Sequence, residues 1–138
     1  MDGILLTKEN QIFHEKGDIF HIIKKSSNGF SKFGEAYFTT VKEGEIKGWK
    51  RHKEMTLNLT VPVGEVEFIV SDRKGDFSKY TLSPKNYYRL TISPNLWVAF
   101  RGVGEYNLVI NIADLEHNPD EAENISLEEI QYEWKNNG

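Results

Sequence analysis

The residues with the clearest chemical potential lie between positions 46 and 54, where the sequence reads IKGWKRHKE. His52 is suited to general acid–base chemistry, because imidazole titrates near neutrality. It lies among cations that repel one another when they are close. The cluster therefore predicts either a solvated bend or a surface facing an anion, with the histidine doing chemistry. The cations are Lys47, Lys50, Arg51 and Lys53.

Lys50 is two residues from His52, so in an extended strand both side chains point to one face. Lys50 could hold the oxygen of an enolate as a cation. Alternatively it could act as the base itself, if partial burial and its cationic neighbours favour the neutral amine. The same spacing continues as a polar row, which suits sugar hydroxyls in the mouth of a barrel or an ordinary wet sheet face. This row is Thr56, Asn58 and Thr60, and the alternating apolar residues are Met55, Leu57, Leu59 and Val61.

Composition limits the partners of the protein. The formal charge of −4 argues against a nucleic-acid binder, and a local basic cluster in an acidic chain favours a small anionic ligand. The chain has no cysteine, which excludes disulfides and thiolate chemistry. No apolar run approaches the roughly 20 residues that span a bilayer, and the opening MDGILLTKENQ does not resemble a secretory signal. We expect a cytoplasmic protein without membrane association.

Short strand patterns dominate the 138 residues, which suffice for a single domain over 1–138. Turn signals such as SSNG, PVGE and RKGD separate them, which favours an all-β sandwich or barrel such as a jelly roll. A short helix is expected only within 120–134, where Ser126 and Glu129 have the spacing of a capping box. The expected strands are 4–6, 18–25, 36–41, 55–61, 65–72, 87–92, 97–100 and 107–113.

The order of several segments resembles a known family of cupin-fold enzymes, the dTDP-4-dehydrorhamnose 3,5-epimerases and dTDP-sugar 3,4-ketoisomerases. The resemblance runs from about Phe33 to Glu121. It implies a cupin jelly-roll barrel and an enzyme that epimerises or isomerises a nucleotide-linked 4-keto-6-deoxy sugar for a surface polysaccharide. The segments are FGEAYF, GEIKGWKRHKEMT, VPVGEVEFIVSDRKG, NYYRLTISPNLWVAFRGVG and NLVINIADLEHNPDE.

The ketoisomerase signature Arg-Gly-x-His-x-His-Lys aligns with positions 47–53. Lys50 then replaces the first histidine, which the family usually uses as base, and His52 keeps the second. A tyrosine on the strand before this signature matches Tyr37, which the resemblance implies as the acid. The epimerase tyrosine has no match in 113–119, which instead holds Asp114, Glu116 and His117.

We expect neither a metal nor a cofactor. Metal-binding cupins use a His-x-His pair and a second-motif histidine, whereas this chain offers only His52 and Glu54, with Val98 at the second-motif position. A divalent site needs three or four converging ligands.

Other residues are candidates for binding the substrate, each with a simpler structural alternative. Arg73 and Arg101 could hold a diphosphate, because guanidinium groups match phosphate oxygens, and Arg73 also matches a family turn near the nucleotide. Trp49 and Trp97 could stack on a base or fill the core. Glu35 could orient His52 or be solvated at a strand edge. Asn58 and the family-placed His117 complete the set.

The sequence is compatible with two classes of function. The first is an enzyme, either an epimerase or a 3,4-ketoisomerase, acting on a nucleotide-diphosphate sugar. The second is a non-catalytic cupin that binds a nucleotide sugar or glycan intermediate, which the loss of the first histidine favours. The family commonly forms dimers through an exchanged N-terminal strand, and the apolar segment 4–6 is compatible with a homodimer.

Overall fold

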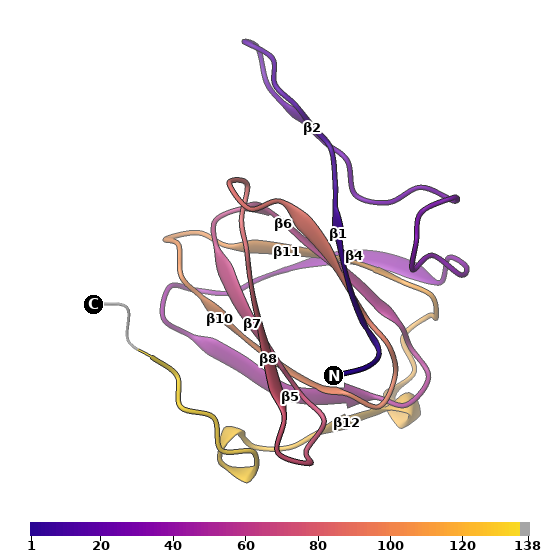
Figure 1. Cartoon of the computed structure of the whole chain (residues 1–138), viewed down its shortest axis with the longest axis vertical. Coiled ribbons are helices and arrows are strands. Elements are labelled where there is room, and N and C mark those ends of the chain that lie inside the picture. The colour runs from indigo at the N-terminus through magenta and orange to yellow at the C-terminus, as the bar shows by residue number, and fades with distance from the viewer. Residues whose placement is uncertain (136–138) are drawn as a thin grey trace.

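The computed structural model describes residues 1–135, in which two antiparallel five-stranded sheets face each other (Figure 1). The first sheet has the order β1 (Ile4–Lys8), β9 (Tyr88–Ile92), β6 (Leu57–Val63), β11 (Leu108–Ala113) and β4 (Glu35–Thr40). The second has the order β12 (Ala122–Asn124), β5 (Ile46–His52), β10 (Trp97–Gly102), β7 (Val66–Ser71) and β8 (Phe77–Leu82). This arrangement confirms the predicted all-β cupin jelly roll.

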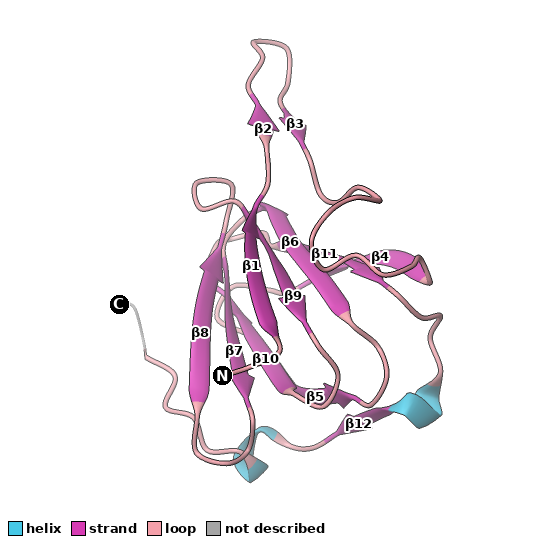
Figure 2. Ribbon diagram, turned by 45° about the vertical axis from the view of Figure 1, so that its right-hand side comes forward, coloured by secondary structure: helices cyan, strands magenta, loops and turns pink. Residues whose placement is uncertain are grey.

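A small hairpin, β2 (Gln11–Ile12) and β3 (Ile19–Phe20), projects from the body of the barrel (Figure 2). The expected strand at 18–25 is thus only two residues long, and the expected strands did not include β2, β5, β8 or β12. Sequence alternation does identify the central strands, since their inward side chains form one buried core between the sheets. That core includes Val61, Phe68, Val70, Leu90 and Ile92.

The expected C-terminal helix is wrong. The helical turns in this part of the chain are two short 3₁₀ turns, Pro119–Glu121 and Leu127–Glu129, which flank β12, and the Ser126 side chain makes no capping hydrogen bond. The chain instead runs from β12 along the outside of the second sheet (Figure 2). There Ile130 packs in a second apolar cluster with Trp49 and Trp97. An extended segment can place alternate apolar residues on the sheet, whereas a helix would turn some of these residues away from it.

The direction of the side chains changes where the chain crosses from β5 to β6. Lys50 and His52 face the space between the sheets, and so do Leu57 and Leu59 after the bend. The spacing from 52 to 57 is odd, so the bend reverses the alternation. The polar row that was considered for sugar binding therefore lies on the opposite face of β6, which corrects that expectation.

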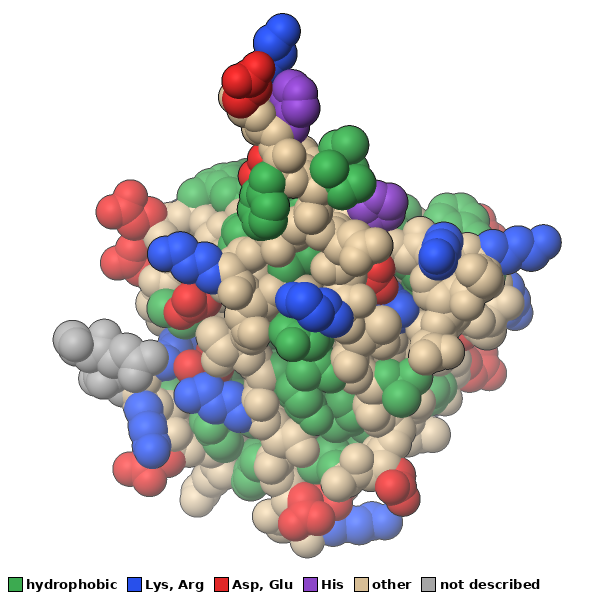
Figure 3. Space-filling view, turned by 45° about the horizontal axis from the view of Figure 1, so that its top comes forward, with side chains coloured by type: hydrophobic (Ala, Val, Ile, Leu, Met, Phe, Trp, Pro, Cys, Tyr) green, Lys and Arg blue, Asp and Glu red, His purple; other side chains and the backbone are tan. Residues whose placement is uncertain are grey.

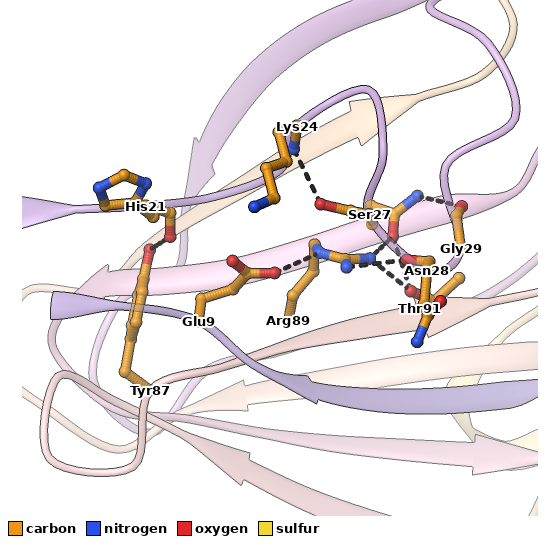
Figure 4. A network of polar contacts seen from close by, with 10 residues as sticks. Glu9, His21, Lys24, Ser27, Asn28, Gly29, Tyr87, Arg89 and Thr91 are labelled. Carbon is orange, nitrogen blue, oxygen red and sulfur yellow. Dashed lines mark hydrogen bonds and ion pairs between the residues drawn. The ribbon is translucent and has the colours of Figure 1, made fainter.

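This outer face of the first sheet is organised around Arg89, whose side chain is fully buried. Its Nε donates to Glu9 Oε2 at 3.0 Å, and its other nitrogens donate to Asn58 Oδ1, Thr91 Oγ1 and the Asn28 carbonyl. Figure 4 shows the guanidinium between Glu9 on one side and Asn28 and Thr91 on the other. Arg89 thus joins Glu9, which follows β1, and the loop residue Asn28 to the first sheet. Among residues 1–135, no helix is long and apolar enough to cross a membrane.

Replacement of Arg89 by methionine should destabilise the fold strongly. The variant leaves the mostly buried Glu9 carboxylate without its partner, and breaking a buried ion pair costs about 3–5 kcal/mol. Urea denaturation measures the loss, with the exposed Lys85→Met as control. A loss no larger than that of the control would contradict this role of Arg89.

Candidate active site

A cavity of about 310 Å³ lies between the sheets and has a mixed lining. Leu57, Leu59, Val98, Phe100 and Val109 form its apolar part. The remaining lining brings together the three side chains predicted to be catalytic, Tyr37 from β4 and Lys50 and His52 from β5. The other lining residues are Thr39, Lys47, Gly48, Asn111 and Asn124.

His52 is held by a carboxylate that was not predicted. Its Nδ1 lies 2.5 Å from Glu121 Oε1, and both side chains are more than nine-tenths buried. A carboxylate partner fixes Nδ1 as the donor. The other ring nitrogen, Nε2, is then free to accept a proton in the cavity. The arrangement is that of an oriented general base.

Glu121 is itself fixed by backbone groups. Its Oε2 accepts hydrogen bonds from the N–H groups of Glu54 and Met55 at 3.2 Å each. Burial raises the pKa of Glu121, but the hydrogen bonds from His52 and from these backbone groups outweigh it, so the net pKa is lowered. The carboxylate is therefore anionic beside the imidazole at neutral pH.

Two cations share the cavity with His52. Lys47 donates through Nζ to Thr39 Oγ1 at 3.0 Å and to the Thr40 carbonyl at 2.7 Å. Lys50 also lines the cavity and is half-buried. Of the two explanations for the basic cluster, the structure favours cations facing a ligand site at these two positions. Of the other two cations, Arg51 points the other way and pairs with Glu123, and Lys53 is exposed in the bend after β5.

Tyr37 is the third predicted catalytic residue. Its phenolic oxygen accepts a hydrogen bond from Asn111 Nδ2 at 3.1 Å, and its side chain is partly exposed at the cavity. Asn111, in contrast, is buried.

The seven predicted substrate-binding residues do not line this cavity. Trp49 and Trp97 lie in the second apolar cluster, on the outer side of the second sheet. Their buried rings fill a core, which was the simpler alternative for both. Asn58 turns its side chain to Arg89 on the outer face of the first sheet.

The predicted arginines are engaged elsewhere. Arg101 lies 3.4 Å from the Glu67 carboxylate, and Arg73 lies over the ring of Trp97 and 3.8 Å from Glu129. Glu35 is at the start of β4, opposite Ala113. His117 is exposed in the loop that follows β11. His52 takes Glu121 as its carboxylate partner, the role that was considered for Glu35.

Sequence reasoning missed Glu121 and Asn111. Each is far from its partner in sequence, 69 residues from His52 and 74 residues from Tyr37 respectively. No local spacing could signal such contacts. Lys47 had a signal, because it takes the place of the arginine in the family signature. Within residues 1–135, no three His, Asp or Glu side chains converge as a metal site would require; that the protein works without metal remains a prediction.

Comparison with known proteins points to the same class of chemistry as the residues of the site. A dTDP-sugar isomerase from Desulfovibrio desulfuricans G20 is 34% identical, with 91% of this chain and 85% of that chain covered and a TM-score of 0.87. A dTDP-4-dehydrorhamnose 3,5-epimerase from Sulfolobus tokodaii is 22% identical, with 98% and 84% covered and a TM-score of 0.84. A sugar 3,4-ketoisomerase from Thermoanaerobacterium thermosaccharolyticum is 19% identical, with 88% of each chain covered and a TM-score of 0.78.

A curated relative is the spore coat polysaccharide biosynthesis protein SpsL of Bacillus subtilis strain 168. It is 22% identical, over 97% of this chain and 96% of that protein. No model of a protein family matches the sequence. The fold and the site define a cupin with an oriented histidine in its barrel. The chain belongs to the family of dTDP-sugar epimerases and isomerases, as its similarity to the Desulfovibrio isomerase shows.

Glu121 should make stability depend on acid pH. Because its folded-state pKa is lowered, the carboxylate stabilises the fold above its ordinary pKa, and this contribution disappears as the pH falls through the lowered value. Glu121→Gln lacks that titration. The difference in unfolding free energy between wild type and variant should therefore shrink from about pH 5 to pH 3, below the ordinary titration range of imidazole. Urea denaturation across this range tests it, and a constant difference would contradict it.

Proposed function

We propose that the protein epimerises or isomerises a nucleotide-linked 4-keto-6-deoxy sugar, without a metal, in the synthesis of a surface polysaccharide. The observation that carries this proposal is the imidazole of His52, held by the buried Glu121 carboxylate and opening into a cavity with Lys50 and Tyr37. Family membership supplies the substrate class, and the similarity to a spore coat polysaccharide protein supports the pathway.

The chemistry begins at the carbon beside the ketone. His52 Nε2 removes the proton, and the electron pair of the C–H bond becomes the enolate. The Lys50 ammonium stabilises the enolate oxygen, a role in which one lost donor typically costs 10²–10³ in rate. Tyr37, which also lines the cavity, returns a proton to the carbon. Glu121 keeps the imidazolium in place between the two transfers.

The anionic part of the substrate would bind near the cations. Related structures contain TDP or TDP-sugars, including TDP-4-keto-6-deoxyglucose in the Thermoanaerobacterium enzyme. Here Lys47 and Lys50 are the cations that line the cavity. Arg73 and Arg101 are engaged with other side chains, so we assign the diphosphate contact to Lys47 first. The apolar residues Leu57 and Leu59 suit the methyl group of a 6-deoxy sugar.

Within this class, 3,4-ketoisomerisation is the second candidate, and two observations favour it. Tyr37, the residue that matches the ketoisomerase tyrosine, lines the cavity. The segment 113–119 contains no tyrosine at the position of the epimerase acid. A non-catalytic cupin that binds the same ligands is the outcome if no proton transfer occurs.

Deuterium exchange tests the proposal. Incubation with a dTDP-4-keto-6-deoxy sugar in D₂O should place label on the ring carbon beside the ketone, detected by NMR. His52→Asn should slow this exchange by about 10²–10⁴ while nucleotide affinity is retained. The exposed His14→Asn serves as the control.

The products separate the alternatives. Label at both C3 and C5 identifies a double epimerisation, whereas a carbonyl that has moved to C3 identifies isomerisation. Binding without any label supports the non-catalytic protein, and a fully active His52→Asn variant removes His52 from the mechanism.

We further propose that the protein is a homodimer, with the projecting hairpin in the interface. Ile12, Phe13 and Ile19 are 49%, 73% and 55% exposed, and apolar side chains are visible along the hairpin in Figure 3. Exposed apolar groups clustered on a protruding element are typical of association surfaces.

A cytoplasmic location remains a prediction.

Light scattering should give twice the mass of one chain, and Phe13→Asp should shift the protein toward monomer, because it buries a charge in the interface. Glu15→Lys, also exposed in the hairpin, is the matched control. A wild-type protein that is monomeric at all concentrations would rule out the dimer.

A further inference from the structure

Asn111 is a buried side chain on β11 that faces the cavity beside Tyr37. Its amide bridges two partners. Oδ1 accepts a hydrogen bond from the backbone N–H of Asn58 at 3.0 Å, and Nδ2 lies 3.1 Å from the phenolic oxygen of Tyr37.

The first contact determines the chemistry of the second. A backbone N–H can only donate, so the atom of Asn111 that faces Asn58 must be its carbonyl oxygen. The atom that faces Tyr37 must then be the NH₂ group, which can only donate. The Tyr37 oxygen is therefore an acceptor in this contact. Its own proton therefore points away from Asn111 and is available to another acceptor.

The backbone of Asn58 is a firm reference for this orientation. Its side chain is fixed on the opposite face of the sheet, where Oδ1 accepts from Arg89 and Thr91 and Nδ2 donates to the Gly29 carbonyl. In the register of β6 with β11, the last pair toward Asn58 is Asn111 opposite Leu59. Beyond it, the N–H of Asn58 finds its acceptor in the side chain of Asn111 and not in the backbone.

We propose that Asn111 is a positioning residue that makes Tyr37 a proton donor in the reaction. This inference rests on the proposed function, in which Tyr37 returns a proton to the enolate. In that step the O–H bond of Tyr37 breaks, the electron pair of the enolate forms the new C–H bond, and the negative charge moves to the phenolic oxygen. The N–H of Asn111 already points at this oxygen and stabilises the phenolate.

Asn111→Asp reverses the contact with little change of shape. The carboxylate still accepts from the Asn58 N–H, but it can only accept from Tyr37, so it draws the phenolic proton away from the cavity. We expect kcat to fall by about 10²-fold, within the usual contribution of a positioned acid, and KM to stay nearly constant. Asn10→Asp, at an exposed position, controls for the added charge.

A double-mutant cycle separates positioning from a general structural effect. In a Tyr37→Phe background, Asn111→Asp should cause no further fall in kcat, because the two residues act as one unit. An unchanged kcat in the single variant, or the same fall in both backgrounds, would overturn the proposal.

A measurement without substrate keeps this result distinct from the proposed function. In ¹H–¹⁵N NMR spectra, the side-chain amide of Asn111 is identified by its absence in Asn111→Asp. Tyr37→Phe removes its acceptor and should move the bonded amide proton upfield. If no 4-keto sugar reacts but this shift is seen, the contact stands and only the proposed reaction fails. An unmoved signal overturns the contact itself.

Discussion

The site depends on one carboxylate. Glu121 accepts the Nδ1 hydrogen of His52 and the backbone N–H groups of Glu54 and Met55. The last two belong to the bend that carries the chain from the second sheet to the first. Buried donors left without partners are costly, so the group that orients the imidazole also satisfies the bend. The geometry of the base and the path of the chain are fixed together.

The two faces of the first sheet have different structural roles. Its inner face supplies apolar residues to the core and the cavity, while its outer face holds the buried guanidinium of Arg89. Asn58 connects the two, because its side chain belongs to the Arg89 network and its backbone N–H donates to Asn111 at the cavity. A polar network on the outside thus fixes the backbone against which the cavity residues are placed.

The fold was predictable from the sequence because alternation of apolar and polar residues survives in single strands. The prediction from this alternation was wrong where the chain bends between β5 and β6. The odd spacing across the bend after His52 places Leu57, not Asn58, in the cavity, and no local pattern announces such a reversal. The pair of Lys50 and His52 was found because both lie within one strand. Glu121 and Asn111 were not, because contacts between distant strands depend on register, which short-range spacing does not contain.

The register of β12 on β5 explains how the Glu121 carboxylate comes to lie beside His52. Ala122 lies opposite His52, Glu123 opposite Arg51 and Asn124 opposite Lys50. Side chains opposite each other share a face, so Asn124 reaches the cavity with Lys50, and Glu123 pairs with Arg51. Strict alternation would turn Glu121 to the side of Glu123. The 3₁₀ turn Pro119–Glu121 breaks the alternation at that residue, which allows its carboxylate to reach His52. A shift of β12 by one residue would separate acid from imidazole, so this three-residue strand places the carboxylate that orients His52.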